Sequence, residues 1–301
     1  MTRIGFIGVG TMGLPMATNL VKKGFTVIAY DMNAEAVKAA AAAGMTAAAS
    51  AAEAVATADI VVTMLPSSPN VQAVYSGDGG VLMAARAGTL CVDMSTIDPG
   101  VTRQVAAAAR ERGVRFVDAP VSGGVPRAID GTLAIMVGGE ATDYTDALPV
   151  LSAMGANVFH VGPVGSGEVV KLCNNLVAGV AAVSVSEAFR IAEAFGVDAK
   201  IVTAVMAKSS GNTWVMEAAH PVPGLVERAA STNGYAPGFM TDLMCKDVGL
   251  AVDAARAHRI PVFVAPAAQQ VYRLASSHGL GRKDFTSVYS FLKPSSDQAP
   301  V

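Results

Sequence analysis

The stretch "GEVVKLCNNLVAGVAAV", residues 167–183, holds one lysine and two asparagines in an otherwise apolar run. Its pattern predicts a long helix, on which residues three and four apart share a face. Lys171, Asn174 and Asn175 can therefore point into one space, with Glu168 one turn earlier. A lysine in such surroundings could exchange a proton with a substrate. From these residues alone, a lysine that reaches solvent or pairs with Glu168 at the surface is an equally open interpretation.

A second group of residues could hold phosphates. The run "IGFIGVGTMGLPMATNLVKKG" reads as a strand, a glycine loop and a helix. In the loop, Gly8 permits a tight turn, Gly10 lets the backbone approach a pyrophosphate, and Gly13 allows close helix–strand packing. Thr11 and Met12 complete the loop at the helix N-terminus, whose free N–H groups and positive dipole end attract phosphates. The context predicts a dinucleotide site.

An acid ends the next predicted strand. Asp31 lies about 20 residues past the glycine loop, where a carboxylate can bind both ribose hydroxyls of NAD and repel the 2'-phosphate of NADP. Met32 and Asn33 follow it, and no arginine does. The predicted cofactor is therefore NAD.

Two further stretches lie at predicted strand ends, where open α/β sheets bind their ligands. Thr96 falls in "DMSTIDP", and Ser122, Gly123 and Gly124 fall in "DAPVSGGVPRAIDGTL". A hydroxyl and unhindered backbone N–H groups could bind a small anion. A plain glycine turn between two strands explains the second stretch as well.

The elements that must position these residues fall into two groups. Short β-rich runs alternate with alanine-rich helical stretches such as 34–43 and 99–112, which indicates βαβ units and a mostly parallel sheet. The predicted strands are 3–8, 25–30, 59–65, 88–94, 114–120, 132–139 and 157–162. Beyond residue 165 helical periodicity dominates. We predict a Rossmann-type α/β domain over residues 1–162 and an all-helical domain over residues 163–301, which the long helix enters.

Composition excludes several classes of function. The 301-residue chain is 52% hydrophobic and 15% charged, with a net charge of −2 and no basic block, so no nucleic-acid partner is expected. Its mean hydropathy is +0.43, but the longest uncharged run of the long helix, 172–186, is shorter than the roughly 20 residues that span a bilayer. No membrane association is expected.

Cysteines and histidines point to a reducing compartment without a metal. Cys91, Cys173 and Cys245 lie far apart and form no CxxC, and the four histidines form no ligand cluster. Because the first predicted strand starts almost at once, no leader peptide is expected, and the predicted location is cytoplasmic. Cys173 follows Lys171 by two positions, so we expect it on another face of the helix, in the core.

Several motifs together resemble one known family, the β-hydroxyacid dehydrogenases, and within it the 3-hydroxyisobutyrate branch. "GFIGVGTMGLPMATNL" is similar to the family's cofactor signature and "DAPVSGGVPRAIDGTL" to its substrate-binding signature. "GSGEVVKLCNN" resembles its catalytic helix, and "KDVGLA", from residue 246, its late cofactor-side motif. "HPVPG" and "KDFTSVYSFL" resemble the hydroxyisobutyrate branch, although serine dehydrogenases share much of both. The resemblance covers nearly the whole chain.

The resemblance implies a fold and a reaction. The fold is an N-terminal Rossmann-type domain, a long connecting helix and an all-helical domain that forms homodimer or homotetramer contacts. The reaction transfers a hydride from the primary alcohol of 3-hydroxyisobutyrate to NAD and gives methylmalonate semialdehyde. The lysine would take the hydroxyl proton, since a positioned acceptor is needed as the hydride leaves. Apolar surroundings and the positive nicotinamide ring would lower the pKa of this lysine, and a substrate carboxylate would raise it.

The resemblance also implies roles for individual residues. Lys171 is the acid/base and Asn175 assists it; Ser122, Gly123 and Gly124 bind the substrate carboxylate. The glycine loop and Asp31 hold the adenosine half. The cofactor channel is lined by Leu65, Pro66 and Asn70, and Thr96 lies near the nicotinamide. Lys246 lies close to the cofactor with Asp247 nearby, and Phe239 closes over the substrate. Trp214 and Arg127 could shape the substrate pocket, or could be a packing residue and a solvated loop residue.

Alternatives stay open on sequence grounds. The nearest are other substrates of the same family: L-serine, a tartronate semialdehyde, or succinic semialdehyde with glyoxylate. Phosphogluconate dehydrogenases have a longer helical domain, and imine reductases usually lack the lysine. A non-catalytic dinucleotide-binding module is the alternative from a different class.

Overall fold

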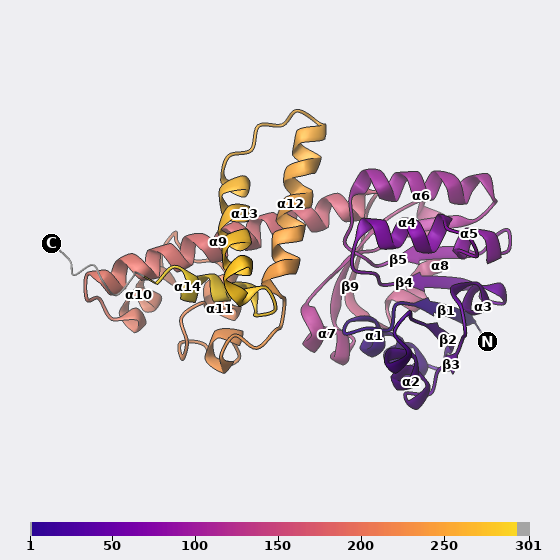
Figure 1. Ribbon diagram of the computed structural model, residues 1–301, viewed down its shortest axis with the longest axis horizontal. Coiled ribbons are helices and arrows are strands. Elements are labelled where there is room, and N and C mark those ends of the chain that lie inside the picture. The colour runs from indigo at the N-terminus through magenta and orange to yellow at the C-terminus, as the bar shows by residue number, and fades with distance from the viewer. Residues whose placement is uncertain (1, 294–301) are drawn as a thin grey trace. The chain divides into compact units, whose positions relative to one another are not determined.

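The computed structural model describes residues 2–293 and is shown in Figure 1. The chain divides into two compact units, residues 1–171 and 172–301. Residues 294–301 of the predicted second domain lie outside the described residues. The division falls inside the long helix, whereas the sequence placed it before that helix, because the first turn of the helix is hydrogen-bonded to strand ends of the first unit.

A nine-stranded sheet forms the centre of the first unit, in the order β3-β2-β1-β4-β5-β6-β8-β7, with β9 paired to β8. Pairings are parallel except those of β8 with β6 and β7. The mostly parallel sheet is confirmed. The strands are β1 Arg3–Ile7, β2 Thr26–Tyr30, β3 Thr46–Ala47, β4 Ile60–Thr63, β5 Leu90–Asp93, β6 Arg115–Asp118, β7 Val121–Ser122, β8 Leu133–Gly138 and β9 Gly155–Gly162.

Helices cover both faces of this sheet. They are α1 Gly13–Lys22, α2 Ala34–Ala42, α3 Ala51–Ala56, α4 Ser68–Ser76, α5 Val81–Ala84, α6 Pro99–Glu111, α7 Gly124–Asp130 and α8 Ala141–Leu151. Neighbouring strand residues face opposite sides. Val62 and Val92 therefore join one core cluster with α1, α2, α7 and α8, while Val61 and Cys91 join another with α3 to α6. In Figure 1, α4 and α6 lie on one side of the sheet and α1 and α2 on the other.

The second unit is helical. It contains α9 Ser166–Ala194 from residue 172 onward, then α10 Ala199–Met206, α11 Trp214–Ala218, the 3-10 turn η1 Ala230–Asn233, α12 Thr241–Ala257, α13 Val264–Ala275, the π-turn η2 Ser276–Leu280, the 3-10 turn η3 Phe285–Ser287 and α14 Val288–Phe291. Helices α12 and α13 pack side by side (Figure 1). Apolar side chains of α9, α12 and α13 share one core cluster. The predicted all-helical second domain is confirmed.

The sequence missed two strands. β3 and β7 are two residues long each, and neither "TA" nor "VS" carries an apolar alternation that could be recognised. Both form because longer neighbours offer their edges: β2 pairs with β3, and β8 pairs with β7.

Candidate active site

The glycine loop connects β1 to α1 where the sheet order reverses, between β1 and β4. Gly8 has a φ of +93°, and a Cβ there would collide with the carbonyl oxygen of Met64 after β4. A Cβ on Gly13 would collide with the carbonyl oxygen of Gly8, so α1 starts directly against the loop. A Cβ on Gly10 would meet no heavy atom within 4 Å.

This loop fits a pyrophosphate. No side chain caps the N-terminus of α1, and open space lies beside Gly10. A phosphate could therefore approach the backbone at Gly10, Thr11 and Met12, where the helix dipole favours negative charge. Ligands of open α/β sheets bind at this reversal of strand order.

Asp31 lies at the same edge of the sheet. The N–H of Gly8 donates to the carbonyl of Tyr30, 2.9 Å away, which brings the glycine loop next to the end of β2. Asp31 Oδ1 accepts a hydrogen bond from the N–H of Asn33 at 2.8 Å. The Asn33 side chain in turn caps α2 through the N–H of Glu35. The turn therefore fixes the predicted ribose-binding carboxylate.

The loops after β4 and β5 are joined to each other. The N–H of Leu65 donates to Ser95 Oγ at 2.9 Å, which brings Leu65 and Pro66 next to the residue that precedes Thr96. Asn70 lies in the first turn of α4, and its Oδ1 accepts from the hydroxyl of Ser67. The structure thus places these predicted cofactor residues at the carboxyl ends of β4 and β5.

A buried carboxylate that the sequence analysis did not identify holds these loops. Asp93, the last residue of β5, is fully buried, and its Oδ1 accepts from Thr63 Oγ1 at 2.7 Å and from Ser95 Oγ at 2.6 Å. Among the described residues, Oδ2 has no hydrogen-bond donor. Burial raises the pKa of Asp93, and the hydrogen bonds from Ser95 and Thr63 lower it less. The sequence signal that could have identified Asp93 is its position: it is an acidic residue at the end of an apolar strand.

The turn after β7 adopts a conformation that favours glycine. Gly123 has a φ of +140° and Gly124 a φ of +67°. A Cβ on Gly123 would lie 2.6 Å from Cδ of Arg127. Ser122 pairs with Ala134 across β7 and β8. Arg127 is exposed, but it lies on helix α7. The expectation that it lies in a loop is therefore wrong.

Lys171 is buried, with 6% of its surface exposed, in the second turn of α9. The interpretation that it reaches solvent is therefore wrong for this chain. Glu168, one turn earlier, is fully buried, and its Oε2 accepts from the N–H of Ile97 at 3.2 Å. The N–H of Glu168 donates to Asp118 Oδ2 at 3.0 Å. The bond from Ile97 ties the start of α9 to the loop that carries Thr96, and the bond to Asp118 ties it to the end of β6.

The second unit holds its own polar cluster. Asn175 is buried, and its Nδ2 donates to Asp247 Oδ2 at 2.6 Å. Asn174 Nδ2 donates to Asn175 Oδ1 at 3.0 Å. The Lys246 ammonium lies 3.1 Å from Asp247 Oδ1. The structure thus brings three predicted site residues of this unit together.

Phe239 lies two residues before α12 begins. It packs edge to face on Phe285, with ring centroids 6.2 Å apart, and its N–H donates to Asp284 Oδ2. Cys173 is exposed on α9, so the expectation that it lies in the core is wrong. Val169, Val170 and Val177, which share a helix face with it, are exposed as well.

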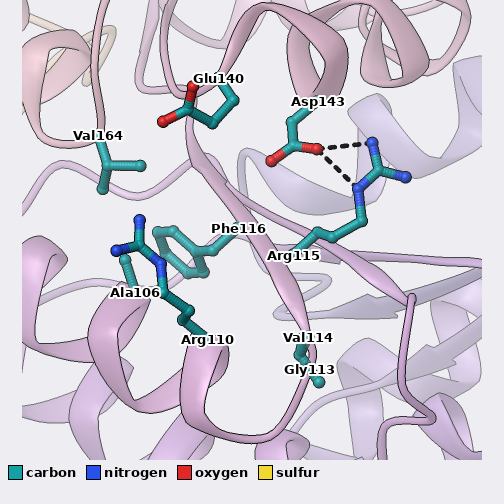
Figure 2. A pocket seen from close by; sticks show the side chains of 9 residues that line it. All are labelled: Ala106, Arg110, Gly113, Val114, Arg115, Phe116, Glu140, Asp143 and Val164. Atoms are coloured by element: carbon teal, nitrogen blue, oxygen red, sulfur yellow. Dashed lines mark hydrogen bonds and ion pairs between the residues drawn. The ribbon is translucent and has the colours of Figure 1, made fainter.

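A cavity of about 270 Å³ lies between α6, β6 and α8 (Figure 2). Its charged lining residues are Arg110, Arg115, Glu140 and Asp143, and Arg115 is paired with Asp143 at 2.6 Å. None of the predicted site residues lines this cavity.

The described residues also bear on metal binding and on membrane insertion. Within residues 2–293 no group of three or more His, Cys, Asp or Glu side chains could hold a metal ion. Of the helices described, α9 is long and apolar enough to cross a membrane by length and composition, and 44% of its most apolar window is buried. Its buried Glu168, Lys171 and Asn175 are consistent with a core helix of a soluble protein.

Comparison with known proteins identifies both units. A family model described as the NAD binding domain of 6-phosphogluconate dehydrogenase matches residues 3–162. A second, described as NAD-binding of NADP-dependent 3-hydroxyisobutyrate dehydrogenase, matches residues 165–292. Both descriptions name NAD binding, which confirms the predicted NAD cofactor.

Curated relatives and a solved structure match nearly the whole chain. The NAD-dependent L-serine dehydrogenase of Pseudomonas aeruginosa is 44% identical and covers 99% of this chain and 100% of its own. The mitochondrial 3-hydroxyisobutyrate dehydrogenase of Rattus norvegicus is 42% identical over 97% of this chain and 87% of its own. The structure of Mycobacterium tuberculosis 3-hydroxyisobutyrate dehydrogenase with L-serine is 41% identical, with a TM-score of 0.93, and covers 98% of this chain and 100% of that chain.

The two family models match the two units in this order, and the solved relative covers 98% of this chain. The chain therefore belongs to the β-hydroxyacid dehydrogenase family, as an NAD-dependent oxidoreductase.

Proposed function

We propose that this protein oxidises the primary alcohol of 3-hydroxyisobutyrate to methylmalonate semialdehyde, with Lys171 as the general acid/base. The observation that carries the proposal is a lysine 6% exposed on α9, one turn after a fully buried Glu168. Desolvation disfavours the charged form of a buried lysine, so more of the amine is neutral and available to accept a proton near neutral pH than in a solvated lysine. The bound nicotinamide supplies the hydride acceptor.

Lys171 and its neighbours in the site have separate proposed roles toward the substrate. Lys171 takes the hydroxyl proton at Nζ and returns it in the reverse direction. The backbone N–H groups of Gly123 and Gly124, with the Ser122 hydroxyl, bind the carboxylate. Asn175, four residues after Lys171 on α9, assists the lysine. We propose the substrate-side roles of Thr96, Phe239 and Asp247, and the cofactor-side role of Lys246, on the same family grounds.

L-Serine is the second candidate substrate. It differs from 3-hydroxyisobutyrate by an ammonium in place of a methyl group. A relative named as an L-serine dehydrogenase is 44% identical to this chain, which favours this alternative. The carboxylate and the primary alcohol are common to both molecules, so the same proton transfer serves either one.

A comparison of kcat/KM for 3-hydroxyisobutyrate, L-serine and 3-hydroxypropionate, each with NAD and with NADP, tests the proposal. We expect the highest value with 3-hydroxyisobutyrate and NAD. A higher value with L-serine would make L-serine the substrate and leave the proposed proton transfer to Lys171 unchanged. No turnover of any of the three, with NAD still bound, would favour a non-catalytic binding module.

We also propose that a second copy of this chain binds to the helical unit. Large apolar side chains of this unit are exposed, and exposed apolar surface is typical of protein–protein contacts. They lie on α9, on α10, at the start of α11 and between α9 and α10: Val177, Ile191, Phe195, Val197, Ile201, Val205 and Trp214. Light scattering of the wild type should give a dimer or tetramer, and Phe195→Glu with Ile201→Glu should give smaller species. A monomeric wild type would contradict this.

Finally, we propose that the protein acts in the cytoplasm. Cys91, Cys173 and Cys245 are free thiols, and free thiols persist in reducing compartments. Fractionation of cells that express the chain is the direct measurement, and recovery from an oxidising compartment would contradict the proposal.

A further inference from the structure

Asp118 supplies a helix cap from a distant part of the sequence. It ends β6, is fully buried, and accepts two backbone hydrogen bonds from the start of α9. Its Oδ1 accepts from Gly165 N at 2.7 Å, and its Oδ2 accepts from Glu168 N at 3.0 Å. Helix α9 begins at Ser166, so Gly165 is the N-cap residue, and it has no side chain that could accept from the N–H of Glu168 at the third helical position. The β6 carboxylate takes the place of the missing side chain.

The space around this carboxylate is closed by two glycines. A Cβ on Gly138 would lie 2.5 Å from Asp118 Oδ1, and a Cβ on Gly167 would lie 2.8 Å from Oδ2. Both distances are shorter than a Cβ contact allows, so glycine is required on both sides of the carboxylate. A carboxylate one methylene longer would not fit in the same place.

The capped turn leads directly to the residues of the site. Its last residue, Glu168, accepts a hydrogen bond at Oε2 from Ile97 N, the residue after Thr96. Lys171 follows Glu168 by three positions, which places both on one face of the helix. Asp118 therefore holds the turn that sets where Glu168 and Lys171 lie relative to the loop after β5.

We propose that Asp118 is a positioning residue for the proton transfer and acts through Lys171. In this role Asp118 acts on the helix: its carboxylate holds the first turn of α9 so that Nζ of Lys171 lies at the position the reaction needs. The inference rests on the proposed role of Lys171. Misplacement of a catalytic group by about 1 Å can cost about 100-fold in rate.

The charge state of Asp118 matters to this role. Burial raises the pKa of Asp118 to about 6, and its backbone hydrogen bonds oppose that rise. Above this pH both oxygens are free to accept the two N–H groups. Below it one oxygen carries a proton, so the cap weakens as the solution becomes more acidic.

A double-mutant cycle separates positioning from plain stability. Asp118→Asn keeps one acceptor and loses the other. We expect it to lower kcat about 10- to 100-fold while the Kd for NAD stays within about twofold. In a Lys171→Ala background the same substitution should change the residual kcat less than about twofold, because residues that act as a unit are not additive. Equal losses in both backgrounds, or an unchanged kcat in the first, would overturn the proposal.

Two further measurements keep the result interpretable. Hydrogen exchange of residues 165–171 should be faster in Asp118→Asn than in the wild type, whatever the substrate is; an unchanged exchange rate would overturn the capping role by itself.

Val150→Ala, which removes buried volume on α8, is the control for lost stability and should lower Tm without changing kcat. If Asp118→Asn does not fold, Asp118→Ser replaces it in the same cycle. A wild type inactive on every 3-hydroxy acid would instead contradict the proposed function.

Discussion

Asp93 and Asp118 are register partners at the carboxyl ends of the parallel strands β5 and β6, and both carboxyl groups are fully buried. Asp93 binds the hydroxyls of Thr63 and Ser95, and Asp118 binds two N–H groups of the first turn of α9. Neighbouring strand ends thus hold two different segments of the candidate site. Burial raises the pKa of both acids, and for Asp118 the charge of Asp93 adds to this.

These raised pKa values predict how the stability of the first unit depends on pH. The folded state binds protons that the unfolded state has released, between the ordinary carboxyl pKa and the folded one, so stability falls as pH rises through that window. Asp93→Asn keeps an oxygen at Oδ1 and removes the charge. The Tm difference, variant minus wild type, should therefore become more positive from pH 4 to pH 7. Calorimetry at several pH values measures it, and a pH-independent difference would contradict the expectation.

The helical unit should respond to acid in the opposite direction. His220 is fully buried, its Nδ1 accepts from Val222 N at 3.1 Å, and burial lowers its pKa to about 4. The unfolded state takes up a proton near pH 6.5, so this histidine's contribution is lost as pH falls from 6.5 toward 4. His220→Gln should flatten this loss when hydrogen exchange of residues 215–275 is followed from pH 7 to pH 4.5. An equally steep loss in the variant would assign the effect to other groups.

Lys171→Ala should lower kcat by about 100-fold or more, which is the usual loss for a general acid/base. Lys171→Arg should fail almost as badly, because guanidinium keeps the charge but does not release its proton near neutral pH. Steady-state kinetics with both variants gives the result, with the Kd for NAD as the control. An active arginine variant would mean that the lysine only supplies positive charge.

Asp31 should set the preference for NAD over NADP. We expect at least a tenfold higher kcat/KM with NAD, since tenfold corresponds to about 1.4 kcal/mol. Asp31→Asn keeps an acceptor for the N–H of Asn33 and removes the charge, whereas Asp31→Ala removes both. If charge sets the preference, both variants should narrow the ratio alike. A ratio that only the alanine variant changes would assign the effect to the turn.

Gly123→Ala should raise the KM for the carboxylate substrate more than about tenfold and leave NAD binding within about twofold, since its Cβ would enter the turn that is proposed to bind the anion. Gly24→Ala is a matched control, because Gly24 also has a positive φ, of +87°, and a Cβ there meets no atom within 4 Å. Both variants should lose stability from backbone strain. A KM that stays at the wild-type value in Gly123→Ala would make the turn purely structural.

The fold was predictable because each βαβ unit carries its own local pattern. The seven predicted strands correspond to β1, β2, β4, β5, β6, β8 and β9, and the glycine loop lies between β1 and α1, a strand and a helix, as predicted. Such features depend on residues close in sequence, so one sequence suffices to find them.

The supporting residues of the site were not predictable in the same way. Asp118 contacts Gly165 and Glu168 across about 50 positions of the chain, and an acid at a strand end is common. Its burial depends on the two glycines that close around it, which no local pattern announces. Cys173 was misplaced for a related reason, since the period of a helix gives its faces but not which of them the rest of the chain covers.

The single bond between Lys171 and Leu172 is where one unit ends and the other begins, in the second turn of an unbroken helix. An exchange of helical units between relatives, made to transfer substrate preference, would put a seam beside the proposed acid/base if it followed this division. A junction at Gly162, before the capped turn, would instead keep Gly165, Glu168 and Lys171 from one parent. Asp118 would then have to come from a parent whose β6 presents the same carboxylate, so chimeras of this family should be chosen by the pairing of these two segments.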